Sequence, residues 1–377
     1  MKSNWQKLPF DEAVADESGG NLKTPQSEFL SEGKFAVVDQ GKELVSGYVN
    51  DRTRLCRSSL PVVVFGDHTR CLKFVNFPFC MGADGIKVLR PKVEADVKYL
   101  YHFLRQLRLH DGGYDRHFKY LKRAEVMLPP LAEQRRIAEV LDRAEALRAK
   151  RRAALAQLDT LTQSLFLDLF GDPVTNPKQW RDSLTLSEVA DMVSGITKGR
   201  KLNGEAVRET PYLAVANVQD KALNLTTVKT IEATASEIAR YKLIKDDLLL
   251  TEGGDPDKLG RGTLWNDELP ECIHQNHIFR VRLTSPDLDP LFLNWLVGSQ
   301  RGKKYFLRSA KQTTGIASIN MTQLRGFPLL APPIKLQREF ARRVTAVERM
   351  KTAHRASMAE LDALFATLQH RAFRGEL

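Results

Sequence analysis

Amide and imidazole side chains gather in one short segment of the sequence, where they can do the chemistry of base recognition. Residues 274–277 read His-Gln-Asn-His and lie beside the apolar residues of a predicted strand. Asparagine and glutamine can bind an adenine edge through two hydrogen bonds, and arginine can bind guanine in the same way. We therefore predict that Gln275, Asn276 and His277 contact a nucleic acid, with the two amides among the base-reading groups.

Lysine and arginine clusters in the second half of the chain suit the phosphate backbone. Residues 253–262 read GGDPDKLGRG, a glycine-rich loop in which Lys258 and Arg261 supply positive charge. Residues 197–201 read TKGRK, and residues 301–311 are similarly basic. A cluster of cations mainly neutralises phosphates, whereas a guanidinium can also read a base edge. We predict that Arg261 reads bases and that three cations hold phosphates: Lys198, Arg200 and Lys201.

The first half of the chain offers matching candidates in two short segments. Residues 66–73 read GDHTRCLK, and residues 115–119 read DRHFK. Any one of these polar side chains is as well explained by simple solvation at the surface, but the set as a whole favours contact with a nucleic acid. The predicted contacts here are His68, Arg70, Lys73, Arg116 and His117.

A catalytic or metal-binding role fits the same residues less well. The sequence has no GxxxxGK[ST] loop and no glycine-rich fingerprint between a clear strand and a helix. Its two Pro-Pro pairs lack the preceding Asn or Asp and the following aromatic residue with which amino-methyltransferases hold the target amine. The pairs Asp67–His68 and His274–His277 do not converge easily on a metal if they lie on strands, because neighbouring residues point to opposite faces. We expect neither a catalytic residue nor a metal site.

Composition limits the classes of protein to which the chain can belong. A net charge of +11 and an isoelectric point near 9.4 favour an anionic partner, either a nucleic acid or a membrane surface. We expect no transmembrane segment, since no apolar run approaches 18 residues, and no secretory signal, since the N-terminal residues lack an apolar stretch. The four cysteines show no paired spacing, which indicates reduced thiols and a cytoplasmic protein.

An internal repeat organises these segments. Residues near the middle of the chain recur, without a gap, 203 positions later, as Pro332 recurs after Pro129. Shorter matches occur earlier in the same order at smaller offsets, beginning with Trp5 and Trp180. A growing offset is typical of a tandem duplication whose second copy has gained loops. The gapless match includes Pro130, Gln134, Arg135, Ala138, Glu145, Arg152, Leu158, Asp159, Leu165 and Phe170.

The repeat predicts two similar mixed α/β domains, each followed by a long helix, and therefore an α+β fold class. Residues 60–66 and 272–283 have the β-branched or alternating pattern of strands, and residues 246–254 end a strand in a glycine loop. Residues 97–107 and 290–306 have helical spacing. The sequence leaves the topology of the sheets open.

Each Pro-Pro pair suits the start of a long helix, and Gly171 and Gly375 suit its end. Polar positions at Arg148 and Arg151, matched by Lys351 and His354, interrupt both apolar seams at the same place, which favours antiparallel pairing over two independent amphipathic helices. About 37 residues would span roughly 55 Å. The predicted seams are Ile137, Leu141, Ala144, Leu155, Leu158, Leu165 and Leu169, and Phe340, Val344, Val347, Met358, Leu361, Phe365 and Leu368.

The motifs that flank the helices resemble those of a known family. These are VMLPPLAEQRRIAEVLD, the following SLFLDLFGDP, and the segments GYDRHFKYLK and QTTGIASINMTQL that precede each Pro-Pro pair. The whole chain resembles the specificity subunit of type I restriction–modification systems. It departs from the family's Glu-Gln pair in the second copy, where Leu336 and Gln337 stand, and identical partner contacts at the two helix entries are therefore not implied.

The resemblance implies a non-catalytic subunit that reads a split, asymmetric site in double-stranded DNA. It implies docking of two methyltransferase (modification) subunits on the helices, together with restriction (motor–nuclease) subunits and no membrane. The chain itself would bind no cofactor, because S-adenosylmethionine, ATP and Mg belong to the partner subunits. Two domains on a helical strut could read half-sites about one turn of DNA, roughly 34 Å, apart.

The expected boundaries are residues 1–127 and 172–330 for two target-recognition domains, and 128–171 and 331–377 for two spacer helices. Two alternatives remain open at this point. One is the specificity factor of a related phage-defence methylation system without the nuclease. The other is a coiled-coil adaptor that binds no DNA and uses its basic charge for protein or membrane contacts.

Overall fold

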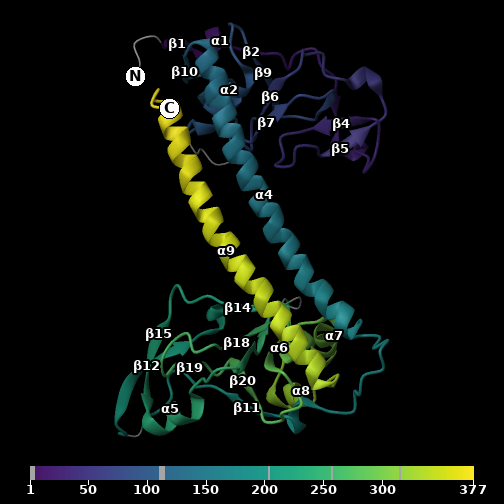
Figure 1. The fold of residues 1–377 in the computed structure, drawn as a ribbon, viewed down its shortest axis with the longest axis vertical. Coiled ribbons are helices and arrows are strands. Elements are labelled where there is room, and N and C mark those ends of the chain that lie inside the picture. The colour runs from purple at the N-terminus through teal and green to yellow at the C-terminus, as the bar shows by residue number, and fades with distance from the viewer. Residues whose placement is uncertain (1–4, 110–114, 203, 256–257, 314–315) are drawn as a thin grey trace. The chain divides into compact units, whose positions relative to one another are not determined.

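The computed structural model describes residues 5–109, 115–202, 204–255, 258–313 and 316–377. The chain forms two compact units, Met1–Ala154 with His354–Leu377, and Leu155–Ala353. Each unit contains one α/β domain and part of both long helices, which the colours of Figure 1 trace from purple to yellow. The boundaries between the units therefore fall inside the helices.

The first unit is built on an antiparallel sheet with the strand order β2-β9-β6-β7. Its predicted strand at 60–66 is β6, which is buried along its whole length. A second sheet has the order β3-β8-β4-β5, and β1 pairs with β10. The strands are β1 Gln6–Pro9, β2 Val14–Asp16, β3 Lys23–Thr24, β4 Phe35–Val38, β5 Gly47–Val49, β6 Val62–Gly66, β7 Leu72–Val75, β8 Phe79–Gly82, β9 Ile86–Pro91 and β10 Glu125–Leu128.

The second unit repeats this topology. Its main antiparallel sheet, β11-β20-β16-β18, matches the first in order. In its second sheet β12 pairs parallel with β19 and antiparallel with β15, as β4 does with β8 and β5. The internal repeat is thus confirmed at the level of topology. The matching strands are β11 Ala190–Ser194, β12 Val207–Leu213, β15 Lys229–Thr234, β16 Leu248–Thr251, β18 Gly262–Leu264, β19 Ile273–His274 and β20 Ile278–Leu283.

The second unit also carries two small sheets that the described residues of the first lack, as expected of a copy with longer loops. They are β13 Val218–Gln219 with β14 Ala222–Leu223, and β17 Gly253–Gly254 with β21 Lys311–Thr313 and β22 Ile316–Ser318. The predicted strand at 272–283 is two strands, β19 and β20, separated by a turn at residues 275–277.

The short helices of the domains pack on the sheets. The predicted helix at 97–107 is α2, and the predicted helix at 290–306 divides into α6 and α7. A Cβ at Gly302 would lie 1.8 Å from Val297 O, so glycine allows the tight corner between these two helices. The bounds are α1 Phe10–Ala13, α2 Val97–Gln106, α3 Phe118–Leu121, α5 Ala235–Tyr241, α6 Pro290–Val297, α7 Gln300–Ser309 and α8 Met321–Arg325.

The two long helices, α4 Leu131–Phe170 and α9 Ile334–Ala372, begin directly after the Pro-Pro pairs. They contain 40 and 39 residues, so each spans about 60 Å, slightly more than predicted. Gly171 adopts φ 77° at the end of α4, and Gly375 adopts φ 72° just beyond α9, so glycine ends both helices as expected.

A buried glutamine attaches each long helix to its domain. Gln134 Oε1 accepts from the backbone N–H of Asp96, and its Nε2 donates to Pro129 O at 2.8 Å. Gln337 repeats this arrangement with Asp289 N at 2.9 Å and Pro332 O at 2.7 Å. Asp96 and Asp289 are the N-caps of α2 and α6, so the repeated glutamine fixes equivalent helix starts in the two units.

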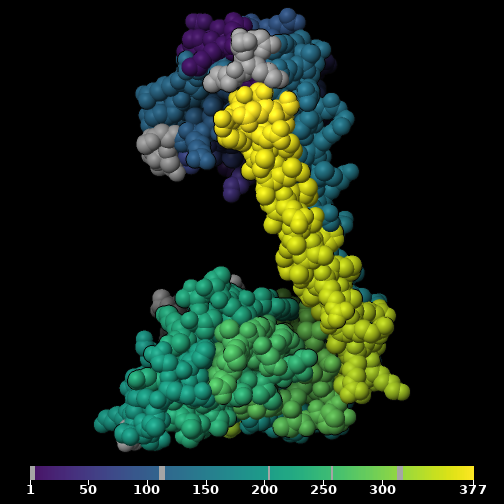
Figure 2. Space-filling model, turned by 60° about the vertical axis from the view of Figure 1, so that its left-hand side comes forward, coloured from purple at the N-terminus to yellow at the C-terminus, as the bar shows by residue number. Residues whose placement is uncertain are grey.

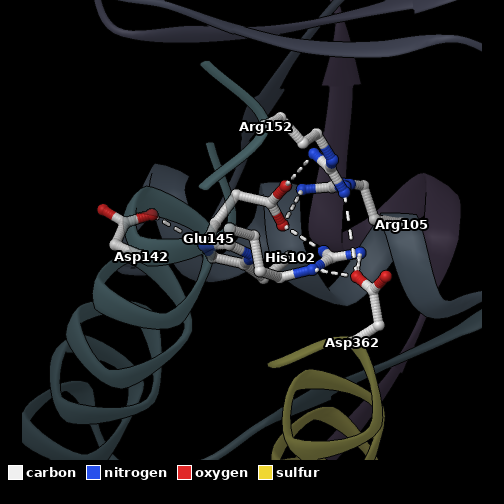
Figure 3. Close-up of polar contacts among 7 residues, drawn as sticks. His102, Arg105, Asp142, Glu145, Arg152 and Asp362 are labelled. Atoms are coloured by element: carbon white, nitrogen blue, oxygen red, sulfur yellow. Dashed lines mark hydrogen bonds and ion pairs between the residues drawn. The ribbon is translucent and has the colours of Figure 1, made fainter. Parts of the chain in front are cut away.

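Ion pairs show that α4 and α9 run antiparallel. In the first unit Arg148 Nη2 lies 2.6 Å from Asp362 Oδ1. In the second unit Lys351 Nζ lies 2.9 Å from Asp159 Oδ1. The two cations occupy the same position of the repeat, and so do the two carboxylates. Figure 3 shows that Asp362 belongs to a larger network with Arg152 and Glu145 of α4, in which Arg105 of α2 also contacts Glu145.

At the centre of the repeat a residue contacts its own counterpart. Arg151 Nη1 donates to His354 Nδ1 at 2.7 Å, and the two positions are 203 residues apart. A self-contact of this kind is expected where two copies of one repeated helix pair antiparallel. The predicted antiparallel pairing is therefore confirmed, and the alternative of two independent helices is wrong.

The core of each unit receives side chains from both long helices. Ile137 and Leu141 of α4 pack with Phe365 of α9 in the first unit. Phe166 and Phe170 of α4 pack with Phe340 of α9 in the second, at ring-centroid distances of 5.5 and 5.4 Å.

The predicted seam needs a correction after the polar interruption of α4. Leu165 and Leu169 are only half-buried, whereas Phe166 and Phe170 are buried. A straight helix with 3.6 residues per turn drifts by about 20° per heptad from a strict seven-residue repeat, so the buried stripe moves by one position along so long a helix.

Candidate nucleic-acid interface

In the second unit, one end of the main sheet carries all the predicted contact segments. Strand β16 ends at Thr251 opposite Ile278, the first residue of β20. The first residue of β18 lies opposite Leu250, and the last residue of β11 lies opposite Phe279. The connections at 195–206, 252–261 and 275–277 therefore leave the sheet at the same end. Segments that are far apart in the sequence thus form one cluster of loops.

Backbone hydrogen bonds join these loops directly. Ile196 N donates to His274 O at 2.8 Å, and Asn276 N donates to Ile196 O at 3.0 Å. A Cβ at Gly195 would lie 1.9 Å from His274 O, so this close approach requires glycine. The turn that carries the candidate amides is therefore held rigidly from its backbone.

His274 anchors the turn from inside the domain. Its imidazole is fully buried, and Nδ1 donates to Ile278 O at 3.0 Å. Burial lowers the pKa of His274 to about 4, so the ring is neutral near pH 7. His277 is exposed and contacts Glu252 Oε2 at 2.5 Å. The two histidines thus have separate surroundings and do not form a common metal site.

Gln275 and Asn276 are half-exposed, as a base-reading role requires. Gln275 N donates to Leu213 O at 3.0 Å, which fixes the backbone while its side-chain amide has no hydrogen bond to the described residues. Asn276 Nδ2 lies 3.5 Å from His277 Nε2, too far for a strong hydrogen bond. Both amides are therefore available to a ligand.

The predicted cations of this unit differ in their surroundings. Lys198 and Lys201 are exposed. Arg200 is half-buried, and its guanidinium forms a two-point contact with the Glu237 carboxylate and donates to Glu232 O at 2.7 Å. The hydrogen bonds from Arg200 to the Glu237 carboxylate lower the pKa of Glu237 to about 2. The expectation that Arg200 serves mainly phosphates is corrected, because its charge is already paired within the domain.

The other two cations lie on the loop before β18. Lys258 is exposed and pairs with Asp255. Arg261 is half-buried, and its Nη1 lies 3.4 Å from Gln219 Oε1.

The first unit brings its own candidates to the corresponding end of its sheet. Asp67 O accepts from His117 N at 2.8 Å, and Asp67 Oδ1 accepts from Phe118 N at 2.7 Å. These bonds join the two predicted segments, 66–73 and 115–119. His68 is half-exposed, and Arg70 and Arg116 are exposed.

Two predicted contacts of the first unit are corrected. Lys73 is 5% exposed, because it lies on the buried face of β7 and its Nζ donates to Asp39 O at 2.8 Å. His117 is 1% exposed. Its backbone is bonded to Asp67, which draws the residue into the domain. Neither side chain is presented to a ligand.

The loop clusters of the two units share one backbone framework. Asp67 N donates to Gly85 O, and Glu252 N donates to His277 O in the same way. Just as Asp67 O accepts from His117 N, Glu252 O accepts from Ile319 N. Glu252 is therefore the structural counterpart of Asp67. The loop that follows is longer in the second unit, between Thr251 and Arg261, than in the first, between Gly66 and Cys71.

Other residues near these loops carry weaker signals in the sequence. Lys303 of α7 is one of several cations in the basic segment 301–311, and no pattern in the sequence distinguishes it or Gln219. Both line a cavity beside Arg261. None of the helices in the described ranges combines the length and apolar character that a membrane crossing needs. Across the same ranges, no group of three His, Cys, Asp or Glu side chains gathers as metal ligands would.

Comparison with known proteins identifies a family model within the first unit. Residues 61–157 match the model described as the type I restriction modification DNA specificity domain. The match runs from β6 into the second half of α4, and so includes the loop that carries His68 and Arg70.

Curated relatives agree with this match. The chain is 26% identical over 268 residues to the StySPI specificity subunit of Salmonella potsdam, covering 67% of this chain and 57% of the relative. It is 23% identical over 359 residues to the EcoR124I/EcoR124II specificity subunit of Escherichia coli, covering 88% and 83%. The EcoKI specificity subunit of Escherichia coli K12 matches at 25%, again over 57% of its length. The chain thus spans little more than half the length of some of these relatives.

Solved structures share the fold over nearly the whole chain. The type I restriction–modification S subunit of M. genitalium superposes with a TM-score of 0.61 at 16% identity, covering 98% of this chain and 96% of that one. A chain from a structure of the type I R-M system, described in terms of complex assembly and conformational transition, gives 0.56 at 17%, covering 100% and 99%. The family model, the curated relatives and the shared fold together support a specificity subunit of a type I restriction–modification system.

Proposed function

We propose that this chain is the non-catalytic DNA-recognition subunit of a type I restriction–modification complex and that each unit reads one half of a split site. One observation carries this proposal: the same backbone framework presents different side chains in the two units. Gly85 of the first framework corresponds to His277 of the second. The loop between Gly66 and Cys71 corresponds to the longer loop between Thr251 and Arg261. Equivalent backbone frameworks that present different side chains suit the recognition of two half-sites with different sequences.

The charge of the loop clusters supports DNA as the ligand. In the second unit the exposed cations Lys198 and Lys201 follow Ile196, whose backbone bonds to Asn276, and the first unit presents the exposed Arg70 on its own loop. Cations on a frame of this kind fix the position of the duplex through its phosphates, while amides distinguish base edges. In this proposal residues 1–127 and 172–330 act as the target-recognition domains, and residues 128–171 and 331–377 act as spacer helices that set the distance between half-sites.

The long helices present equivalent apolar side chains to solvent, which supports the docking of two copies of one partner. Leu147 is 53% exposed and Met350, its repeat counterpart, is 46% exposed. Leu161 and Leu364 form a second such pair at 42% and 48%. Figure 2 shows the outer face of α9, in yellow, uncovered by the rest of the chain. Exposed apolar groups that recur with a repeat suit a partner that binds twice.

We assign this partner to the methyltransferase subunit. A shallow groove of about 420 Å³ surrounds Leu161 and could hold an apolar side chain of that subunit; its other lining residues are Ala156, Gln157, Thr160 and Ser164. The methyltransferase subunits would bring S-adenosylmethionine, and motor–nuclease subunits would bring ATP and magnesium. A complex that reads genomic DNA in this way would act in the cytoplasm.

Mapping methylated adenines tests the proposal. Cells that express the chain with its methyltransferase partner should carry methylation at a single split motif, and cells without the chain should not. An adaptor that binds no DNA would leave no motif that depends on this chain. A phage-defence system without a nuclease would give the same motif but no cleavage of unmodified DNA, so a restriction assay with unmodified phage separates the two.

A further inference from the structure

A cationic cavity of about 270 Å³ lies beside the predicted base-reading loops of the second unit. It adjoins the first residue of β18, at the sheet end from which the turn at 275–277 also leaves. Three elements form its wall: the β13–β14 hairpin, the loop before β18, and the α6–α7 corner. The lining residues are Gln219, Asp220, Lys258, Leu259, Gly260, Arg261, Gly298 and Lys303.

The half-buried Arg261 guanidinium lacks hydrogen-bond acceptors within the described ranges for part of its N–H groups. Nε is buried and has no hydrogen-bond acceptor among the described residues. Nη1 has only a long contact of 3.4 Å to Gln219 Oε1. Buried donors in folded proteins are almost always paired, so an unpaired Nε at a cavity wall indicates an acceptor supplied by a ligand. The parallel N–H groups of arginine match two oxygens of one phosphate.

The charges around the cavity favour an anion. Lys303 and Lys258 add two cations from separate elements, and the Lys258 charge is partly offset by its ion pair with Asp255. Lys303 has no carboxylate within ion-pair distance in the described part of the chain. The one carboxylate in the wall, Asp220, lies 3.4 Å from Lys221 Nζ, so this neighbour offsets its charge. Lys221 in turn lies 4.6 Å from the centre of the Trp295 ring, which holds it at the rim.

We propose that this cavity binds one phosphodiester group of the DNA, with Arg261 as the clamp and Lys303 and Lys258 as supporting charges. The site rests on the proposed DNA-recognition function and reassigns Arg261 from base reading to phosphate binding. A guanine edge also offers two acceptors, but it carries no charge. Arg261 and Lys303 form no ion pair with a carboxylate in the described residues, so they favour a charged group, and Lys258, which pairs with Asp255, contributes less. The phosphate would fix the register in which Gln275 and Asn276 meet the bases.

The test uses the reconstituted complex with its methyltransferase subunits, bound to specific and scrambled duplexes over a salt series. Arg261→Ala and Lys303→Ala should each weaken binding to both duplexes by a similar factor, ~tenfold for Arg261, and lower the salt slope by about one unit. Lys304→Ala is the matched control, because Lys304 is an exposed neighbour on α7 that does not line the cavity. A loss confined to the specific duplex in Arg261→Ala, or equal behaviour of the Lys303 and Lys304 variants, would overturn the proposal.

Neutral methylphosphonates placed singly along the specific duplex locate the phosphate. One substitution should weaken the wild-type complex but have little further effect on Arg261→Ala. Additive losses at every position would contradict the site. If the wild-type complex does not prefer the specific duplex, the DNA-recognition function itself has failed. If the wild-type complex prefers the specific duplex and the Arg261→Ala and Lys303→Ala variants bind DNA as well as the wild type does, only the phosphate site is rejected.

Discussion

Replacing Gln337 with alanine should weaken the junction between α9 and the second domain more than the replacement of an exposed glutamine does. The Gln337 side chain is fully buried and makes three hydrogen bonds to backbone groups: it accepts from Asp289 N at 2.9 Å and donates to Pro332 O at 2.7 Å and Asp287 O at 3.0 Å. Truncation removes all three partners at once. Each buried group left unpaired costs about 1–3 kcal/mol, so we expect a total of about 3–5 kcal/mol after partial rehydration.

Hydrogen exchange at the Asp289 amide measures this loss directly. A loss of ~3 kcal/mol corresponds to exchange faster by roughly 100-fold when local opening is at equilibrium. Gln134→Ala should give a smaller effect at the Asp96 amide, because Gln134 makes two such bonds rather than three. Gln163→Ala, at an exposed position of α4, is the matched control. Unchanged exchange at Asp289 in Gln337→Ala, or a larger effect from Gln134→Ala, would refute this account of the repeated glutamine.

Three further outcomes follow from the same structure. Arg148→Ala should lower the free energy of unfolding, measured in urea, by about 1–2 kcal/mol, because Arg148 contacts Asp362, Glu145 and the Phe365 ring. Lys351→Ala should lower the free energy of unfolding by less, because the carboxylate partners of Lys351 are exposed and rehydrate. Equal losses in the two variants would contradict this ranking. The pKa of His274 is about 4 in the folded chain and about 6.5 in the unfolded chain, so the unfolded chain becomes protonated at a higher pH. The contribution of His274 to stability should therefore be fully present above pH 6.5 and decline as the pH falls toward 4. An NMR titration of His274 in the folded protein with a midpoint near 6.5 would disprove this prediction. Leu147→Asp should remove one bound methyltransferase subunit, and the double variant with Met350→Asp should remove both. The mass of the complex, measured by light scattering, counts the bound subunits, and Arg143→Asp is the control at an exposed position. Two bound copies in the double variant would reject the docking surface.

The sequence predicted the repeat, the two helices and their antiparallel pairing, because these depend on features that sequence records directly. A gapless 203-residue offset, a Pro-Pro start and a glycine end are all local signals. The polar interruption was recognised for the same reason, and the structure adds that Arg148 and Lys351 occupy equivalent ion pairs within it.

Residue roles were harder to predict where tertiary packing decides them. Lys73 follows a polar loop in the sequence, but its strand turns the side chain toward Asp39. Arg200 lies in a basic run, yet Glu237, far along the chain, pairs with its charge. Lys303 reaches the cavity beside Arg261 only because Gly302 allows α7 to fold back on α6. None of these long-range contacts leaves a local pattern in the sequence.

Exchange of one domain tests most directly the claim that each unit reads one half of the site. Residues 176–330 would be replaced by the corresponding region of a relative with a different motif, and methylated adenines would be mapped in cells that express either chain with the same methyltransferase partner. We predict that the new motif keeps one half-site and the spacer length of the original and takes its other half from the relative. A motif in which both halves change, or neither does, in a complex that still methylates DNA would contradict the account.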